Sequence, residues 1–475
     1  MVHACFTSIY QHKPIAVIGF GVTGRACVEF MRRHGAQVSL FDVKHDELRK
    51  SVGNEPLLKG VNIIPFNDDS CFKGFDTVVV SPGVNTQLPA IQNALSEGLP
   101  LISDIELFAR HNSVPAIGIT GSNGKSTVVD MLHKGFSATG LKVGVGGNFG
   151  NSILAFLDEP YDLIILELSS FQLELTFSLH LRIAAILNVT EDHIDRHGDI
   201  IGYARAKQRI FKHADICIVN RDDPRTFSEG DTHRLNSFGS FHSLKVSGVK
   251  SGFNNNPSHN ANDSRDIYSS DLGISIGDEL IVAQEKIRHL ANHNVLNAQV
   301  ALLCAKSILN TVEEMQCFIE SVINYSGLAH RFALVHVEQM SNGKTIHWVN
   351  DSKATNPGAA IAAIKCIPDD AILVMLVGGD SKGTDLRELR ELIRRRVAKL
   401  IVLGKDAKRF SNCCADTSFV ETIDDAVLLA NEFSHATQQN TYVLLSPACA
   451  SIDMFKNYQE RGKQFEQAVL RVEVV

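Results

Sequence analysis

The sequence predicts an α/β protein of about three domains, each built around a mostly parallel sheet. Its 475 residues exceed what one hydrophobic core usually supports. Apolar strand-like runs alternate with helical patterns along most of the chain, which is typical of parallel βα units. Many of these runs lead into loops rich in glycine, serine or proline, and such loops gather at one edge of a parallel sheet.

The composition is that of an ordinary globular protein, with 44% hydrophobic and 21% charged residues. A formal net charge of −7 argues against a general nucleic-acid binder. The start MVHACFTSIYQHKP lacks the features of a signal peptide, and runs such as AILVMLVGG are too short to span a bilayer. Ten cysteines without a C-x-x-C pair fit a reduced compartment. We therefore expect a cytoplasmic protein with no membrane span and no nucleic-acid partner.

The first segment, residues 1–103, opens with IAVIGFGVTGRACVEFMRRHGAQVSLFD. This stretch has the order of a dinucleotide-binding βαβ unit. A strand leads into the glycine triplet Gly19-x-Gly21-x-x-Gly24, and a helix and a second strand ending at Asp42 follow. The pattern predicts a Rossmann-like domain that holds a nucleotide's phosphates and ribose, and both NAD and a UDP-sugar satisfy it. A later strand ends in Ser81-Pro82-Gly83, which is either part of this site or an ordinary turn.

The second segment, residues 104–327, carries AIGITGSNGKSTVVD, in which a strand meets a glycine turn that ends in Gly124-Lys125-Ser126. The common phosphate loop has its first glycine six residues before the lysine, where this chain has Ile119. The shorter loop can still bind phosphate, because backbone N–H groups and the start of the helix attract anions. Lys125 reaches the outer phosphates, and the Ser126 hydroxyl suits Mg²⁺. We predict a P-loop ATPase-like domain; the alternative is a glycine turn before a surface lysine.

Charged side chains follow the later strands of this segment. Glu167 ends the apolar run LIILELSSF, where a carboxylate is costly unless it is paired or binds a metal such as Mg²⁺. The loop EDHIDRH, with His193, matches no strong zinc pattern; it suits Mg²⁺ or an anionic substrate, or is a solvated loop. On the helix ARAKQRIF, spacing alone makes Lys207 a surface lysine. Residues from about 227 to 271 are rich in Ser, Asn, Gly and Asp, and we expect an exposed, partly disordered excursion there.

The third segment, residues 328–475, repeats the order of strand, polar loop and helix and predicts a second Rossmann-like domain. Its loops NDSKATNP, GGDSKGTD and SPACAS offer lysines and hydroxyls that suit an anionic ligand. Each loop alone is as easily a polar turn, but together at one sheet edge they favour a composite site. Arg331 lies at the domain junction, where it either reaches a phosphate held by the neighbouring domain or forms an interdomain salt bridge.

Taken in order, these stretches resemble the Mur ligases. The matching motifs are GITGSNGKST, GVGGNFG, LELSSFQLE, LNVTEDHIDRH, ARAKQRIF, HRF, NDSKATN and SPACASIDMFKNYQERG. They cover nearly the whole chain apart from the Asn/Ser-rich excursion, and the third and last resemble the member that adds D-glutamate. The resemblance implies a cytoplasmic, ATP-dependent ligase of peptidoglycan precursor synthesis that joins D-glutamate to UDP-N-acetylmuramoyl-L-alanine through an acyl phosphate. It also implies two Mg²⁺ ions and a carbamylated lysine at Lys207, and we expect a monomer.

The resemblance assigns roles to residues at matching positions. The catalytic residues would be Lys125, His193 and Lys207, and the metal ligands Ser126, Glu167, His193 and Lys207. ATP would contact Gly121, Ser122, Asn123, Gly124, Lys125, Ser126, Thr127, Asn294, Arg331 and Asp351. The UDP-sugar would contact Val22, Thr23, Asp42, Ser81, Gly83 and Asn148, and D-glutamate would contact Thr355, Lys382, Ser451 and Tyr458. Either His193 or a carboxylate would take the proton of the attacking amine.

The chain departs from the family pattern at two places. Val43-Lys44 stand where the family often has Thr-Arg, which predicts weaker contacts to uracil or phosphate, and Tyr458 stands where it often has Phe. An NAD-dependent oxidoreductase would leave the phosphate loop unexplained, and a non-enzymatic ATP switch has no need of NDSKATN. A sister ligase for L-alanine, a diamino acid or a dipeptide differs in the final motif, and the folate-polyglutamate ligase lacks the N-terminal domain.

Overall fold

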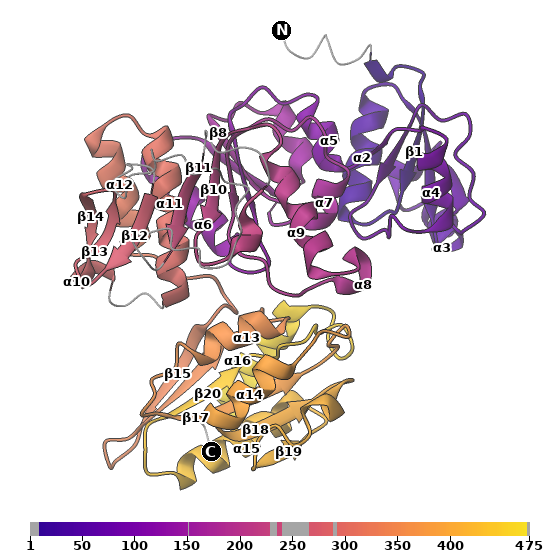
Figure 1. Cartoon of the computed structure of the whole chain (residues 1–475). Helices are drawn as coiled ribbons and strands as arrows, with labels where there is room; N and C mark the ends of the chain where they lie inside the picture. Colours follow the sequence, from indigo (N-terminus) through magenta and orange to yellow (C-terminus); the bar gives the residue numbers. More distant parts are fainter. Residues whose placement is uncertain (1–8, 151, 229–234, 240–265, 288–291, 473–475) are drawn as a thin grey trace. The chain divides into compact units, whose positions relative to one another are not determined.

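The computed structural model describes residues 9–150, 152–228, 235–239, 266–287 and 292–472 (Figure 1). It contains a five-stranded, a nine-stranded and a six-stranded sheet. The chain divides into two compact units. The first comprises Met1–Asn188, Ala204–Ile287 and Leu296–Ile323, and the second comprises Val189–Tyr203, Arg288–Val295 and Asn324–Val475. The predicted α/β class with mostly parallel sheets is confirmed.

The five-stranded sheet is parallel, in the order β3-β2-β1-β4-β5. Its elements are β1 (Pro14–Ile18), α2 (Val22–Arg33), β2 (Gln37–Asp42), α3 (His45–Ser51), β3 (Asn62–Pro65), β4 (Thr77–Val80), α4 (Pro89–Ser96) and β5 (Leu101–Ile102). All of β4 and all but the first residue of β1 are buried, and apart from Thr77 these strands consist of apolar residues. Strand order reverses at β1, which is where open α/β sheets bind ligands.

The nine-stranded sheet follows the order β14-β13-β12-β11-β10-β9-β6-β8-β7. Its strands are β6 (Ala116–Thr120), β7 (Val143–Gly147), β8 (Leu163–Glu167), β9 (Leu181–Ile186), β10 (Ala214–Asn220), β11 (Leu235–Gly239), β12 (Asp266–Ser270), β13 (Gly273–Ile276) and β14 (Glu279–Ala283). Only the pairings of β13 are antiparallel. The sequence predicted this mostly parallel sheet because its strands alternate with helical patterns.

The helices of the middle part of the chain are α5 (Asp104–Ala109), α6 (Lys125–Ala138), α7 (Ser170–Glu174), α8 (Ile194–His197), α9 (Ile200–Gln208), α10 (Gln284–Ile287), α11 (Asn292–Ile308) and α12 (Val312–Ile323). Helices α6 and α12 pack closely at Gly135, where a Cβ would lie 2.4 Å from the Phe318 ring. The glycine therefore sets how near the phosphate-loop helix lies to its neighbour.

The Asn/Ser-rich excursion differs from its predicted form. Strands β11 and β12 lie within the stretch predicted to be exposed, and they pair in parallel with each other. Phe238 is buried, because its side chain lies in a strand between two neighbours. Composition was a poor guide here because a few apolar residues at strand spacing suffice to extend a sheet that already exists. Residues 229–234 and 240–265 lie outside the described part.

The six-stranded sheet follows the order β15-β16-β20-β17-β18-β19, and only the edge strand β15 is antiparallel. Its elements are β15 (Ala333–Gln339), β16 (Thr345–Asn350), α13 (Pro357–Ile364), β17 (Ile372–Gly378), α14 (Arg387–Arg396), β18 (Val397–Leu403), β19 (Thr417–Phe419), α15 (Ile423–Ala436), β20 (Thr441–Leu445) and α16 (Tyr458–Val472). Two separate apolar clusters use alternate residues of β17, Leu373 in one and Val374 in the other. A core on each face of the sheet is the doubly wound arrangement that the sequence predicted.

None of the helices described has both the length and the apolar character of a membrane-spanning segment.

Candidate active site

The glycine loop after β1 is built as the sequence predicted. A Cβ at Gly24 would lie 1.8 Å from the carbonyl oxygen of Gly19, so only glycine lets α2 begin against this loop. The Ser81 hydroxyl donates to the same carbonyl oxygen at 3.2 Å. The Asp42 carboxylate accepts from the backbone N–H groups of Phe20, at 2.7 Å, and Lys44, at 2.8 Å. Asp42 and Ser81 thus converge on one loop at the carboxyl edge of the sheet.

The phosphate loop between β6 and α6 takes its shape from Asn188, just beyond the end of β9. The side-chain oxygen of Asn188 accepts from Asn123 N–H at 2.9 Å, and its amide nitrogen donates to Asn123 O at 3.2 Å. Its backbone oxygen accepts from Ser122 N–H at 2.9 Å. Gly124 has φ of 85°, and a Cβ there would lie 2.8 Å from Oδ1 of Asn297. The loop therefore requires glycine at this position, both for its backbone and for space.

Lys125, the first residue of α6, folds its ammonium group back over the loop. Its Nζ donates to the carbonyl oxygens of Gly121 at 2.7 Å and Ser122 at 2.9 Å. The next residue, Ser126, donates from Oγ to Glu167 Oε2 at 2.6 Å. Glu167 is 3% exposed and also accepts from Nδ2 of Asn148 at 2.8 Å. The strand-end carboxylate is therefore paired, as its burial requires.

These oxygen atoms suit Mg²⁺. A serine hydroxyl beside a carboxylate at the start of a phosphate-loop helix is a hard-oxygen donor set of the kind that shares Mg²⁺ with nucleotide phosphates. No group of three or more His, Cys, Asp and Glu side chains able to hold a metal occurs in the described ranges. Protein ligands are sparse at such sites in general, because phosphates and water complete the octahedron.

Lys207 is buried, contrary to the prediction from spacing that it lies on the surface. Its side chain is 1% exposed, and Nζ donates to Gly121 O at 2.9 Å, the oxygen that Lys125 also uses. The two residues are far apart in sequence, so helical spacing carries no trace of the contact. Burial of a lysine at a phosphate loop is the kind of costly placement that marks functional sites.

In the second unit, the loop before α8 faces two loops of the six-stranded sheet. The Asp192 carboxylate lies 3.7 Å from Nζ of Lys382 and 3.5 Å from Nδ2 of Asn356. It also lies 3.7 Å from Nε2 of His193. His193 and Lys382 have φ of 55° and 50°, the left-handed region that non-glycine residues seldom adopt and that recurs at functional sites. Asp192 thus lies beside both His193 and Lys382, which was predicted to bind the amino acid.

Asp351 is buried at the carboxyl end of β16. It accepts from Phe332 N–H at 3.2 Å and from the Ser446 hydroxyl at 2.9 Å. Burial raises the pKa of Asp351 to about 7, although these hydrogen bonds and the positive charge of Arg331 oppose the rise. The junction arginine therefore lies within electrostatic reach of a carboxylate of its own domain, which tests neither of the two roles predicted for it.

The loops after β16 and β20 are joined by a residue that sequence reasoning missed, Arg461 of α16. Its guanidinium is 2% exposed and donates to Oγ and O of Ser352 and to O of Cys449. Ser352 Oγ in turn donates to Tyr458 O at 2.8 Å, and the Tyr458 ring lies 4.0 Å below Nζ of Lys353. The feature that marks Arg461 as part of this site is its burial next to the proposed ligand-binding loops, and burial cannot be read from the sequence.

The remaining predicted residues are placed as follows. Thr355 lies in the loop after β16, Ser451 is buried after β20, and Asn294 lies in the first turn of α11. Asn188, which holds the phosphate loop, and Asn297, which lies close to Gly124, were not predicted. Asn297 follows Asn294 by one helical turn, so helical periodicity is the signal that would have found it. Val22 is exposed at the start of α2, and Gly83 lies beyond β4.

Comparison with known proteins agrees with these features. The family model of the Mur ligase middle domain matches residues 119–305, and that of the MurD-like Mur ligase N-terminal domain matches residues 13–103. A protein of Haemophilus influenzae named UDP-N-acetylmuramoylalanine–D-glutamate ligase is 37% identical over 465 residues, covering 96% of this chain and 98% of its own length. The protein of the same name from Mannheimia succiniciproducens is 37% identical over 462 residues, 96% of this chain and 97% of its own.

Solved structures show the same fold. The MurF ligase of Thermotoga maritima in complex with ADP has a TM-score of 0.57 at 16% identity, covering 98% of this chain and 97% of its own. The UDP-N-acetylmuramate-alanine ligase MurC from Thermotoga maritima has a TM-score of 0.55 at 17% identity, covering 98% and 100%. The full-length match to curated relatives confirms the resemblance read from the motifs, and this chain belongs to the Mur ligase family.

Proposed function

We propose that this chain joins D-glutamate to UDP-N-acetylmuramoyl-L-alanine at the expense of ATP, in the cytoplasm, as a step of peptidoglycan precursor synthesis. The observation that carries the proposal is its full-length 37% identity to ligases named for that reaction. The phosphate loop with its buried Ser126–Glu167 pair supports ATP use. The domains are residues 1–103 for the UDP-sugar, 104–327 for ATP and 328–475 for the amino acid, and we expect a monomer.

The nucleotide site is assigned to the phosphate loop and three residues beyond it. The loop residues are Gly121, Ser122, Asn123, Gly124, Lys125, Ser126 and Thr127, and the others are Asn294, Arg331 and Asp351. Loop N–H groups and the positive end of α6 attract the phosphates. Lys125 reaches them by leaving the two loop carbonyl oxygens that its ammonium group now contacts, a movement that its flexible stem permits.

The metal ligands are assigned in two sets. Ser126 and Glu167 hold one Mg²⁺, which the paired oxygens at the helix start support. His193 and a carbamylated Lys207 hold the second. Carbamylation joins the neutral Lys207 amine to the carbon of CO₂ and releases one proton, so a cation becomes an oxygen ligand. When bound, the metal ions offset the negative charge of the phosphoryl group as it moves.

The other two ligands are assigned to strand ends. Val22, Thr23, Asp42, Ser81 and Gly83 hold the uridine diphosphate, with Asn148 reaching the sugar nucleotide from the central domain. Thr355, Lys382, Ser451 and Tyr458 surround D-glutamate. The convergence of Asp42 and Ser81 on the glycine loop supports the first assignment. Arg461, by joining the loops after β16 and β20, supports the second.

The reaction then proceeds in two steps. Lys125 and the loop N–H groups stabilise the γ-phosphoryl group of ATP as it passes to the terminal carboxylate of the L-alanine residue, giving an acyl phosphate and ADP. The amine of D-glutamate attacks the acyl carbon, and phosphate leaves as the amide forms. His193 or a carboxylate takes the proton of the attacking amine; Asp192, beside both His193 and Lys382, is well placed for the second alternative.

The testing experiment is ATP-dependent phosphate release with UDP-N-acetylmuramoyl-L-alanine, offering D-glutamate, L-glutamate, L-alanine and meso-diaminopimelate in parallel. We expect release with D-glutamate alone. Phosphate release with another amino acid would support a ligase activity with a different amino-acid specificity. No phosphate release with any of the four amino acids would contradict the proposal. Lys125→Ala should abolish amide formation while circular dichroism stays unchanged; retained synthesis by that variant would refute the mechanism.

A further inference from the structure

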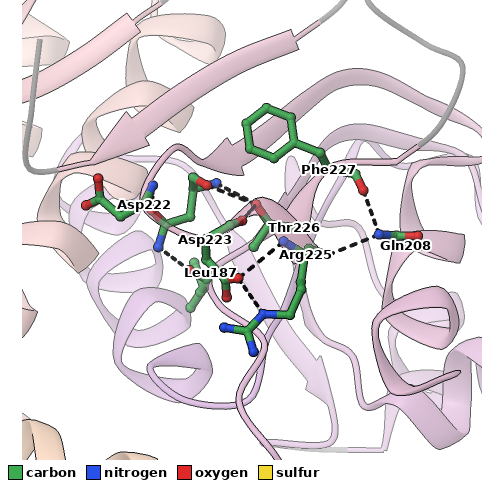
Figure 2. Close-up of polar contacts among 8 residues, drawn as sticks. Leu187, Gln208, Asp222, Asp223, Arg225, Thr226 and Phe227 are labelled. Carbon is green, nitrogen blue, oxygen red and sulfur yellow. Dashed lines mark hydrogen bonds and ion pairs between the residues drawn. The ribbon is translucent and has the colours of Figure 1, made fainter. Parts of the chain in front are cut away.

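Gln208, the last residue of α9, anchors the helix that carries Lys207. Its side-chain Nε2 donates to the carbonyl oxygen of Arg225 at 3.0 Å and to that of Phe227 at 2.6 Å (Figure 2). Both acceptors are backbone atoms of the turn that follows β10. One amide group therefore fastens the end of α9 to a segment that follows it closely in the sequence but lies outside the helix.

The turn that receives Gln208 is itself held firmly. The Asp223 carboxylate accepts from the backbone N–H of Arg225 at 3.2 Å and from its side-chain Nε at 2.8 Å (Figure 2). The Thr226 hydroxyl accepts from Asn220 N–H at 3.0 Å and donates to Asp223 O at 2.8 Å. Asn220, Asp223 and Thr226 are all buried. Such a satisfied polar network is rigid, so the turn is a fixed anchor rather than a mobile loop.

The same turn is tied to the phosphate loop from its other side. Nδ2 of Asn220 donates to Leu187 O at 2.9 Å. The N–H of Leu187 donates to Thr120 O at 2.9 Å, and the neighbouring Asn188 holds Ser122 and Asn123. The path from phosphate loop to turn therefore runs through buried backbone and amide contacts without a gap.

Lys207 closes this path into a ring. Starting from Thr120, which precedes Gly121, hydrogen bonds lead through Leu187, Asn220 and the turn to Gln208. Nζ of the adjacent Lys207 returns to Gly121 O. A lysine side chain has four rotatable bonds, so the position of its amine also depends on the position of the helix end that carries it. The two bonds of Gln208 fix the helix end from which that side chain starts.

We propose that Gln208 is a positioning residue for Lys207: it holds the Lys207 amine against the phosphate loop, where the amine takes up CO₂. The proposal rests on the proposed function, because it gives Lys207 the carbamate described above. An error of about 1 Å at a reacting group can reduce turnover by about 100-fold.

The test compares Gln208→Met with Arg205→Gln in the full chain. Methionine keeps the length of the side chain and removes both donors, and Arg205 is an exposed residue of the same helix. Protein without substrates is equilibrated with ¹³C-labelled bicarbonate, and the carbamate signal is followed by NMR as bicarbonate increases. For Gln208→Met we expect the half-saturating bicarbonate concentration to rise about tenfold, the order expected for losing one or two net hydrogen bonds. Arg205→Gln should match the unaltered chain.

Turnover provides a second readout. At low bicarbonate, kcat of Gln208→Met should fall by the same factor, and at saturating bicarbonate it should recover to within about twofold, with the KM for D-glutamate unchanged. A defect of folding alone would not be rescued by bicarbonate. If Gln208→Met is too unstable, Gln208→Asn, which keeps the amide on a shorter stem, should show a smaller rise in the same concentration.

Three results would overturn the proposal. The first is a loss of turnover with an unchanged carbamate signal, and the second is no change in either readout. The third is absence of a carbamate signal from the unaltered chain while it still releases phosphate with D-glutamate; this removes the inference and leaves the ligase function standing. Failure of the ligase function itself would appear separately, as no phosphate release with D-glutamate.

Discussion

Asn188→Ala should weaken ATP binding because Asn188 holds the phosphate loop in shape. The substitution removes one hydrogen bond accepted from Asn123 N–H and one donated to Asn123 O, at 2.9 Å and 3.2 Å. The backbone bond from Ser122 to Asn188 O remains. The strand β9 should therefore stay in place while the loop that follows β6 loses its side-chain brace.

The size of the effect follows from the two bonds. Each intramolecular hydrogen bond contributes about 0.5–1.5 kcal/mol net, so the pair is worth ~1–3 kcal/mol. If all of this is lost from the positioning of the loop, kcat/KM for ATP falls roughly 5- to 150-fold. The free energy of unfolding should fall by the same ~1–3 kcal/mol.

Asn112 offers a matched control at the other end of β6. Its side chain donates to Val114 O at 2.7 Å and accepts from Val114 N–H at 3.0 Å, the same pair of bonds. Asn112→Ala should lower the free energy of unfolding by a similar amount and leave kcat/KM for ATP unchanged. Steady-state kinetics with varied ATP and thermal unfolding would be measured for both variants. Equal kinetic effects, or none for Asn188→Ala, would refute the reasoning.

Three further predictions concern the metal, pH and the glycine loop. Glu167→Gln should raise the Mg²⁺ concentration for half-maximal turnover about 10- to 100-fold, because a neutral amide replaces an ionised oxygen ligand; an unchanged Mg²⁺ titration would contradict this role. Asp351 has its pKa raised by burial from 3.8 to about 7, so its stabilising contribution is complete below pH 3.8 and is lost as pH rises through 7. Chemical unfolding should therefore show Asp351→Asn gaining stability relative to the unaltered chain between pH 4 and 7, by at most roughly 4 kcal/mol; a pH-independent difference would exclude the raised pKa. Gly24→Ala must separate α2 from Gly19 O and should cost at least ~1–3 kcal/mol of unfolding free energy, whereas Gly21→Ala, with nothing within 4 Å of its Cβ, should keep the thermal midpoint.

The fold was largely predictable because its signals are local. A glycine turn between an apolar run and a helical pattern identifies a βα loop wherever it occurs, and the loops at Gly19 and Gly124 were found in this way. The excursion near residues 227–271 was misjudged where β11 and β12 lie, because those short strands depend on an existing sheet edge and not on their own composition.

The site was predictable only in part. Local spacing marked Lys125 and Ser126, which begin a helix, and Glu167, which ends a buried strand. The same reasoning placed Lys207 on the surface, and only the family resemblance gave it a role. Arg461 and Asn188 lie within two of the motifs that carry the family resemblance, but neither was assigned a role, because each acts by holding loops together and that contact appears only in the structure.

The sequence by itself determined that this chain has glycine-rich βα loops, that it is an α/β protein, and that its motifs are those of the Mur ligases. The tertiary structure alone decided which distant groups meet: the side chains of Ser126 and Glu167, 41 residues apart, and the Lys207 amine and the Gly121 carbonyl oxygen, 86 residues apart. The physical reason is the separation along the chain over which each interaction acts. Glycine turns and helix starts depend on residues that are close in sequence. The partner of a buried charged group depends on the packing of the whole sheet, because that packing brings distant strand ends to one edge.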